Sequence, residues 1–119
     1  MKKITDLKTA LAIFEDASNK HAEATEKGDY KTINKNYKIV INAVKFIKSQ
    51  NAIDALLDFL TYPSVGARLS AGIFLLPQHE GKALKVLAEI AGKTGILSLT
   101  AKMTISEWKK GNLKHLYEI

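Results

Sequence analysis

Few side chains in this sequence are of the types that perform catalysis or hold a metal ion, and they do not cluster. The three histidines, His21, His79 and His115, lie in separate segments, and there is no cysteine. Without cysteine the chain has neither disulfide bonds nor thiolate metal ligands. It also has no P-loop, no G-x-S-x-G and no H-E-x-x-H motif. We therefore expect no enzymatic activity and no cofactor.

The two histidine neighbourhoods that resemble a metal or acid–base site have poor geometry. His21 is followed by Glu23 and Glu26, but residues two and five positions apart do not share a face of a helix. His79 stands beside Glu80 near the start of a predicted helix, where we expect a solvent-exposed first-turn residue. Neither neighbourhood predicts a metal site.

The segment KTINKNYKIVINAVKFIKSQ, residues 31–50, contains five lysines and no acidic residue. On a helix, four of them fall within an arc of about 80°, and the fifth, Lys48, lies about 60° further round, at the border of the apolar face. A solvated helix face explains why lysines cluster. It does not explain why glutamate is absent, since lysines at four-residue spacing repel each other. We therefore interpret the segment as a candidate binding surface, with a plain solvated face as the alternative. The lysine stripe comprises Lys31, Lys35, Lys38 and Lys45.

Arg68 is the only arginine. Its planar guanidinium suits a fixed, partly buried ion pair better than a lysine does. We expect it to pair with Asp54 or Asp58 on the preceding helix, and its alternative role is an anion contact. In that alternative role, Arg68 belongs to the candidate binding surface.

Composition limits the possible partners. The chain has 119 residues, of which 46% are apolar and 25% charged, and its net charge is +6. These values predict one globular domain whose partners are acidic. No apolar run approaches the roughly 20 residues needed to span a bilayer, so we expect no membrane association and a cytoplasmic location.

The apolar pattern is helical throughout and predicts an all-α fold of about six helices in one domain, residues 1–119. Two N-terminal helices are expected over residues 4–27 and 30–49, with Thr5 or Asp6 as the first cap and Gly28 as the stop. Helix pairs are expected over about 51–76 and 78–110. The two pairs match when the chain is shifted by thirty residues, which also superimposes the expected caps Ser64 and Thr94. Such a repeat is typical of an α-α superhelix.

The last predicted helix is apolar on two sides, because Ile96, Leu99 and Met103 lie nearly opposite the Trp108 side. A helix of this kind is covered on both sides or forms an interface. We expect residues 113–119 to fold back over the Ile96 side as a cap. Within the second helix of the first pair, Gly66 and Gly72 predict a close approach between helices.

The C-terminal two thirds resemble known helical proteins. The segment YPSVGARLSAGIFLLP resembles the second helix of a HEAT-type repeat. Residues 30–113, through ARLSAGIFLLP, KALKVLAEIA and AKMTISEWKKGNL, resemble the bacterial domain of unknown function 2019 family, whose most recognisable element here is Met103, Thr104, Trp108 and Gly111. The resemblance implies a small HEAT/armadillo-like fold and no activity.

The function expected from these features is a non-catalytic helical-repeat binding module with an unidentified, acidic protein partner. Small bacterial HEAT-like proteins include immunity or antitoxin-like partners of toxins, so the resemblance implies that role as a subtype. The alternative is binding of nucleic acid or another polyanion along the basic face of residues 30–49. We expect a monomer or a weak dimer.

Overall fold

Two long helices begin the chain, and an aspartate caps each of them. The computed structural model describes residues 3–119 and places α1 over Leu7–Lys27 and α2 over Tyr30–Ser49. Asp6 accepts a hydrogen bond from the Thr9 N–H at 2.7 Å, which satisfies a free donor of the first turn. Gly28 ends α1 with φ of +70°, in the left-handed conformation that glycine adopts without strain. Of the two predicted caps, Asp6 is therefore the one used, and the predicted stop at Gly28 is confirmed, whereas the helix begins at Leu7 rather than at residue 4.

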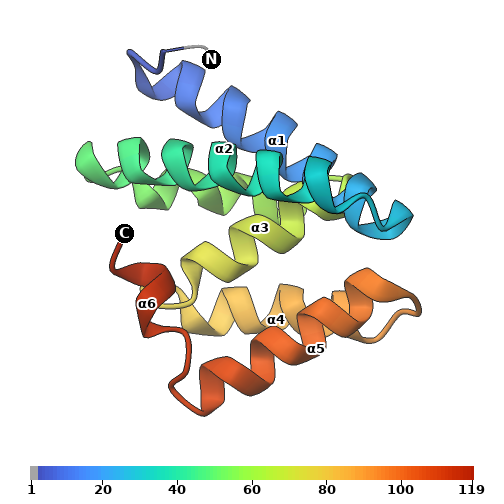
Figure 1. Cartoon of the computed structure of the whole chain (residues 1–119). Coiled ribbons are helices and arrows are strands. Elements are labelled where there is room, and N and C mark those ends of the chain that lie inside the picture. Colours follow the sequence, from blue (N-terminus) through green and yellow to red (C-terminus); the bar gives the residue numbers. More distant parts are fainter. Residues whose placement is uncertain (1–2) are drawn as a thin grey trace.

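The rest of the described chain is also helical, and the fold is all-α, with no strand among residues 3–119. Figure 1 shows α1 and α2 in the upper part of the molecule, α4 and α5 in the lower part, and α3 between them. The remaining elements are η1 (Ile53–Thr61), α3 (Val65–Leu75), α4 (Glu80–Ala91), α5 (Ile96–Lys109) and the short α6 (Lys114–Tyr117).

The short helix predicted to open the first pair is present as η1, a 3₁₀ helix. The caps expected for the two pairs are wrong in part. Ser64 stands at the N-cap of α3 without a side-chain bond, and the N-cap of α5 is Gly95 rather than Thr94. Instead, Asn19 of α1 supplies the missing acceptor of α3, because its Oδ1 accepts from the Ala67 N–H at 3.1 Å. The thirty-residue correspondence of caps is thus not a structural one.

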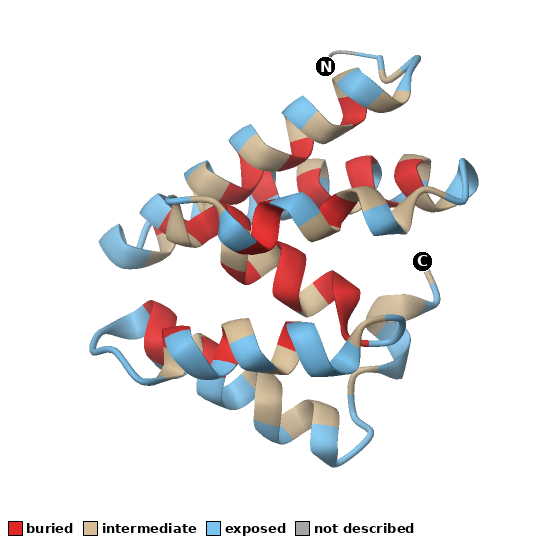
Figure 2. Cartoon of the chain, turned by 180° about the vertical axis from the view of Figure 1, so that it is seen from behind, coloured by how far each residue is buried: buried red, intermediate tan, exposed pale blue. Residues whose placement is uncertain are grey.

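The core is one cluster that runs through the long helices and η1. Phe14 of α1 is fully buried in it, with its ring centroid 5.4 Å from that of Phe59 in η1 and 6.4 Å from that of Phe74 in α3. Figure 2 shows buried positions recurring along the inward sides of the helices and along the length of α3. Helix α3 therefore ties the N-terminal pair to α4 and α5.

The backbones of α1 and α3 come into direct contact at Gly66. A Cβ atom at Gly66 would lie 2.8 Å from the Ser18 carbonyl oxygen and 2.9 Å from the Asn19 Cα. Such distances are shorter than any ordinary contact, so only glycine fits. Gly72 approaches a side chain instead, since a Cβ there would lie 3.1 Å from Leu87 Cδ2. The close approach predicted from the two glycines is present at both.

Replacing Gly66 with alanine should destabilise the protein by about 2 kcal/mol or more, because the new methyl group meets backbone atoms that cannot move aside. Gly81→Ala in α4 is the matched control. Nothing lies within 4 Å of a Cβ there, so this change should stabilise the protein by roughly 0.4–1 kcal/mol. Urea denaturation of both variants measures the difference. Equal stability of the Gly66→Ala variant and the unaltered protein would contradict the backbone contact between α1 and α3.

Candidate functional site

A groove between α1 and α2 has a volume of about 1250 Å³. We call it the basic groove. Helix α1 contributes residues at successive helical turns, and α2 does the same on the other side. The residues that line it are Lys8, Thr9, Ala12, Ile13, Asp16, Ala17 and Lys20 of α1, and Lys31, Thr32, Asn34, Lys35, Asn36, Lys38 and Ile39 of α2.

Three members of the lysine stripe line this groove. Lys31, Lys35 and Lys38 are exposed along its α2 side, whereas Lys45, although also exposed on α2, lies outside it. Within residues 3–119, none of the four makes an ion pair within 4.0 Å. The structure thus places the stripe in solvent and divides it between the groove and the rest of α2.

Helix α1 adds two lysines that the sequence analysis did not single out. Lys8 and Lys20 line the groove opposite the stripe. The single acidic residue in the lining, Asp16, pairs with Lys20 at 3.0 Å, and both side chains are well exposed. The helical wheel of α1 shows Lys8 and Lys20 but does not say which side of α1 faces α2, and this is why sequence reasoning missed them.

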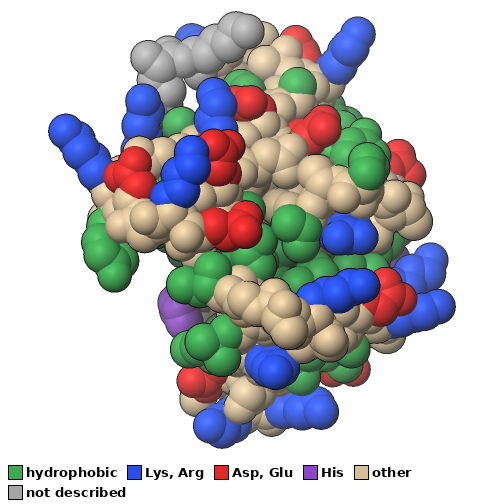
Figure 3. Space-filling model, turned by 90° about the vertical axis from the view of Figure 1, so that its right-hand side faces the viewer, with side chains coloured by type: hydrophobic (Ala, Val, Ile, Leu, Met, Phe, Trp, Pro, Cys, Tyr) green, Lys and Arg blue, Asp and Glu red, His purple; other side chains and the backbone are tan. Residues whose placement is uncertain are grey.

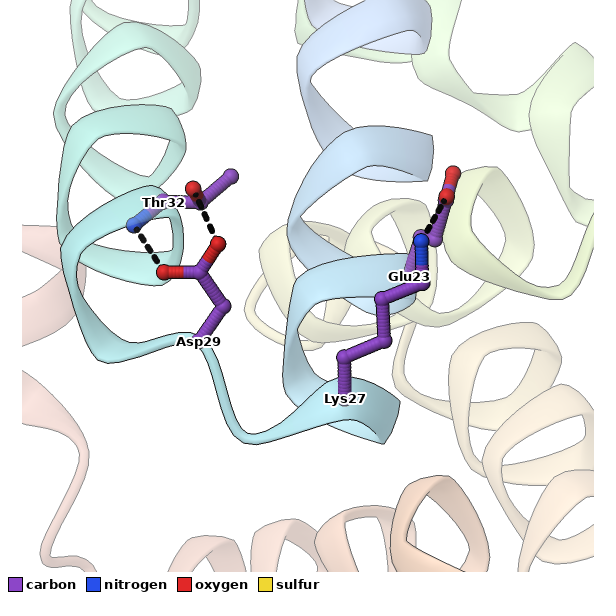
Figure 4. Close-up of polar contacts among 4 residues, drawn as sticks. All are labelled: Glu23, Lys27, Asp29 and Thr32. Carbon is purple, nitrogen blue, oxygen red and sulfur yellow. Dashed lines mark hydrogen bonds and ion pairs between the residues drawn. The ribbon is translucent and has the colours of Figure 1, made fainter.

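The acidic residues near the α1–α2 turn bind locally. Figure 4 shows Lys27 donating to Glu23, at 2.8 Å, and Asp29 accepting from the Thr32 hydroxyl and N–H at 2.7 and 3.2 Å. The bond from Lys27 holds the pKa of Glu23 below its ordinary value, and the bonds from Thr32, the hydroxyl first, do the same for the pKa of Asp29. Figure 3 shows Lys and Arg side chains projecting from the upper part of the molecule with acidic side chains among them.

Lys48 belongs to a different site. It is half-buried, and its Nζ donates to the carbonyl oxygens of Tyr117 and Ile119 at 2.7 and 3.1 Å. A cavity of about 100 Å³ beside it is lined by both of these residues and by Phe74 of α3. Lys48 therefore holds the C-terminal segment, consistent with its place at the border of the apolar face, and it is separate from the basic groove.

The expected partners of Arg68 are wrong. Asp54 contacts His79, with 2.7 Å between its Oδ1 and the His79 Nε2, and Arg68 makes no ion pair within 4.0 Å in the described chain. The aspartates point outward because the 3₁₀ helix η1 turns Leu56 and Phe59 into the core. Arg68 instead lines a cavity of about 210 Å³ with Glu26, Glu89 and the start of α5, and its buried Nε has no hydrogen-bond partner.

The histidines do not come together. His79 is the N-cap residue of α4 and is only partly exposed, contrary to the expected open position. His21 is half-buried beside Tyr37, with 6.3 Å between the ring centroids, and burial lowers the pKa of its imidazole. Residues 3–119 hold no group of three or more His, Asp or Glu side chains placed to bind a metal ion.

The predicted cap over the last helix is wrong. Ile96, Leu99 and Met103 remain 49%, 55% and 59% exposed. The C-terminal segment packs on α2, α3 and the other side of α5, where the Tyr117 and Trp108 rings meet edge to face at 5.8 Å. Its Tyr117 hydroxyl donates to the Ile73 carbonyl oxygen at 2.6 Å. These bonds direct the segment to a site that offers polar partners, which the row on α5 lacks.

Comparison with known proteins adds no relative: no family model, no curated protein and no solved structure matches the chain. In residues 3–119, no helix combines the length and the apolar character that crossing a bilayer requires.

Replacing Tyr117 with phenylalanine should lower the free energy of unfolding by about 1 kcal/mol at neutral pH, because the Ile73 carbonyl loses its partner. Burial raises the pKa of the Tyr117 hydroxyl above its ordinary value. Above about pH 10 the unfolded chain therefore loses this proton before the folded protein does, and the stability contributed by Tyr117 falls. The difference between the two proteins should shrink as the pH rises above 10.

Urea titrations between pH 7 and 11 measure this difference. Tyr30→Phe is the control, since Tyr30 is 77% exposed and should behave like the unaltered protein at every pH. A Tyr117→Phe variant that shows no loss of stability at neutral pH would contradict the docked position of the C-terminal segment.

Proposed function

We propose that this chain is a non-catalytic binding module that holds an acidic protein partner in the basic groove. The observation that carries the proposal is the charge of the lining: five lysines against one acidic residue, which already pairs with Lys20. The lysines are Lys8, Lys20, Lys31, Lys35 and Lys38.

The unneutralised lysines account for attraction and orientation of such a partner. A concave surface lined by one sign of charge speeds encounter with a partner of the opposite sign, and complementary potentials select against wrong partners. Because the lysines are exposed, each single pair contributes little and is weakened by salt. The partner must therefore engage several lysines at once, as one acidic segment lying along the groove would.

The lining favours a protein over a nucleic acid. It contains neither arginine nor an aromatic residue, and these side chains provide the usual base contacts and stacking platforms of nucleic-acid sites. It does contain apolar side chains, Ile13 and Ile39 among them, which suit the side chains of a protein. Polyanion binding along the lysine stripe is the second candidate, because phosphate contacts need only the charge.

The wider biological setting of this proposal comes from the sequence resemblance. Residues 30–113 resemble the bacterial domain of unknown function 2019 family with its HEAT-like repeats, and this supports a cytoplasmic protein, monomeric or weakly dimeric, without catalytic residues. We include an immunity or antitoxin-like role in the proposal only when the toxin is acidic, because the basic groove would repel a cationic nuclease.

Reversing the groove charges tests the proposal. The triple variant Lys31→Glu, Lys35→Glu and Lys38→Glu should bind poly-L-glutamate at least about tenfold more weakly in low salt, because three attractions become repulsions. The matched control reverses Lys82, Lys85 and Lys102, which are exposed and lie outside both the groove and the lysine stripe. It has the same net charge and should retain most of the binding. Fluorescence anisotropy with labelled poly-L-glutamate measures both.

The outcomes separate the two candidates. Equal losses of affinity in the two triple variants would overturn the assignment of binding to the groove, because net charge alone would then explain both losses. Tighter binding of a DNA duplex than of poly-L-glutamate, with the same dependence on the groove lysines, would assign the groove to a polyanion and overturn the protein partner. Circular dichroism of each variant should show unchanged helix content, since the replaced side chains are exposed.

A further inference from the structure

We infer that the acidic partner of the basic groove also carries apolar side chains, and that these dock on a second face of α2, beyond the lysine stripe. This inference rests on the proposed function and deepens it, because charge alone would accept any acidic segment. The second face is a row of four residues at three- and four-residue steps, which we call the tyrosine row: Tyr30, Ile33, Tyr37 and Ile41.

The tyrosine row is open to solvent at its aromatic positions. Tyr30 is 77% exposed and Tyr37 is 46% exposed, and they are the only aromatic residues among the exposed large hydrophobic side chains of residues 3–119. Ile33 and Ile41 are half-buried. On a helical wheel the row falls within an arc of about 80°, and it extends over about 17 Å. Tyrosine is enriched among the residues that dominate binding at protein interfaces, because its rigid ring buries a large area.

Tyr37 packs against α1 on one side. Its ring lies beside the His21 imidazole, with 6.3 Å between the ring centroids. Burial lowers the pKa of His21, so the imidazole is uncharged at neutral pH and adds to the apolar surface. A side chain that is already packed on one side loses less conformational entropy on binding than a free one. Tyr37 is therefore the residue of the row best suited to anchor a partner.

The lysine stripe borders the tyrosine row. Each tyrosine directly precedes a lysine of the groove lining, in the pairs Tyr30–Lys31 and Tyr37–Lys38. Lys45, which lies outside the groove, is about 40° from the edge of the row on the helical wheel. A partner that leaves the groove across α2 would thus meet lysines before it meets the row. The charge complementarity that attracts an acidic segment extends to the edge of the apolar face.

The other end of the same face of α2 already holds a peptide segment of this chain. Val44 and Lys48 continue the row at helical spacing, and they line the small cavity together with Tyr117 and Ile119. Lys48 donates to two carbonyl oxygens of the C-terminal segment, and Figure 1 shows α6 near the C-terminal end of α2. At this end, apolar side chains of a polypeptide pack on the face while a lysine binds their backbone. The tyrosine row offers the same combination of apolar surface and lysine without such a cover.

The composition of the row favours protein side chains over the alternatives. Ile33 and Ile41 alternate with the two tyrosines, and a branched aliphatic side chain offers no plane on which a nucleic-acid base can stack. Such a mixture suits the apolar and aromatic side chains of a protein. A second copy of the chain is disfavoured, because each copy would bring its own lysine stripe to the contact.

Two labelled random copolymers of equal length test the inference. One contains glutamate and tyrosine and the other glutamate and alanine, both in a ratio of about four to one, so that they have the same charge density and differ in apolar side chains. The glutamate–tyrosine polymer should bind the unaltered protein at least about fivefold more tightly, because its rings bury apolar area against the row. Fluorescence anisotropy measures both affinities.

Three variants locate the preference on the protein. Tyr37→Ala should reduce it to about twofold or less and leave the affinity for the glutamate–alanine polymer within about twofold of the unaltered protein. Leu99→Ala is the matched control, because it removes an exposed apolar side chain from α5, and it should keep the full preference. Tyr30→Ala removes a largely exposed member of the row, so it should not affect folding, and it should lower the preference by about twofold. If circular dichroism shows that Tyr37→Ala is unfolded, Tyr30→Ala decides.

These results distinguish the inference from the proposed function. If both polymers bind equally, and both lose affinity in the Lys31, Lys35 and Lys38 triple variant, the inference is overturned while the proposed function stands. A preference that the two tyrosine variants leave unchanged also overturns the inference. If neither polymer depends on the groove lysines, the proposed function fails as well.

Two further measurements exclude the other occupants. Single-stranded oligo(dT) that binds more tightly than the glutamate–tyrosine polymer, and loses affinity in Tyr37→Ala, would assign the row to a nucleic acid and overturn the inference. Sedimentation of the protein alone should show no self-association that depends on Tyr37. A dimer that Tyr37→Ala dissociates would assign the row to a second copy instead of the acidic partner.

Discussion

The contact of the α1 and α3 backbones at Gly66 is the constraint on which the arrangement of the other helices depends. A hydrogen atom in place of a side chain brings the start of α3 against the Ser18 carbonyl and the Asn19 Cα. At this distance the Asn19 side chain reaches the Ala67 N–H, so α1 provides the cap that α3 does not make for itself. One side of α1 is thereby occupied by α3, and α2 packs on another. The groove forms along α1 and α2 where neither α3 nor η1 covers them.

The charge of the groove follows from how the acidic residues are used. Glu23 and Asp29 are engaged within one turn of their own positions, by Lys27 and by the first turn of α2. Asp16, inside the groove, pairs with Lys20. Exposed pairs of this kind contribute little to stability, but they fix where the negative charge is. The lysines of α2 have no such neighbour, because residues 31–50 contain no acid.

The C-terminal segment shows how polar bonds override a simple match of apolar surfaces. Leu116, Tyr117 and Ile119 would suit the exposed row on α5 by their apolar character alone. They lie instead where Lys48 binds two carbonyl oxygens and where the Tyr117 hydroxyl binds the Ile73 carbonyl. Backbone carbonyls and a hydroxyl near the core need hydrogen-bond partners. Packing of the segment on the exposed row of α5 would leave these groups unsatisfied. The row of Ile96, Leu99 and Met103 remains exposed as a result.

The sequence by itself determined the helical class, the first two helices with the Gly28 stop between them, and the presence of one acid-free basic face. Each of these depends on neighbours within one or two helical turns, through the apolar period, side-chain capping and charge spacing. It also indicated the close approaches at Gly66 and Gly72, since glycine inside a helix needs a reason of this kind. The sequence could not show which side chains of segments distant in sequence contact one another. Only the tertiary structure decided that Asn19 caps α3, that Asp54 binds His79 rather than Arg68, and that Lys48 holds the C-terminal segment. It also decided that Lys8 and Lys20 face the lysine stripe across a groove, because the rotation of α1 about its own axis is set by its packing on α3 and not by its own residue pattern.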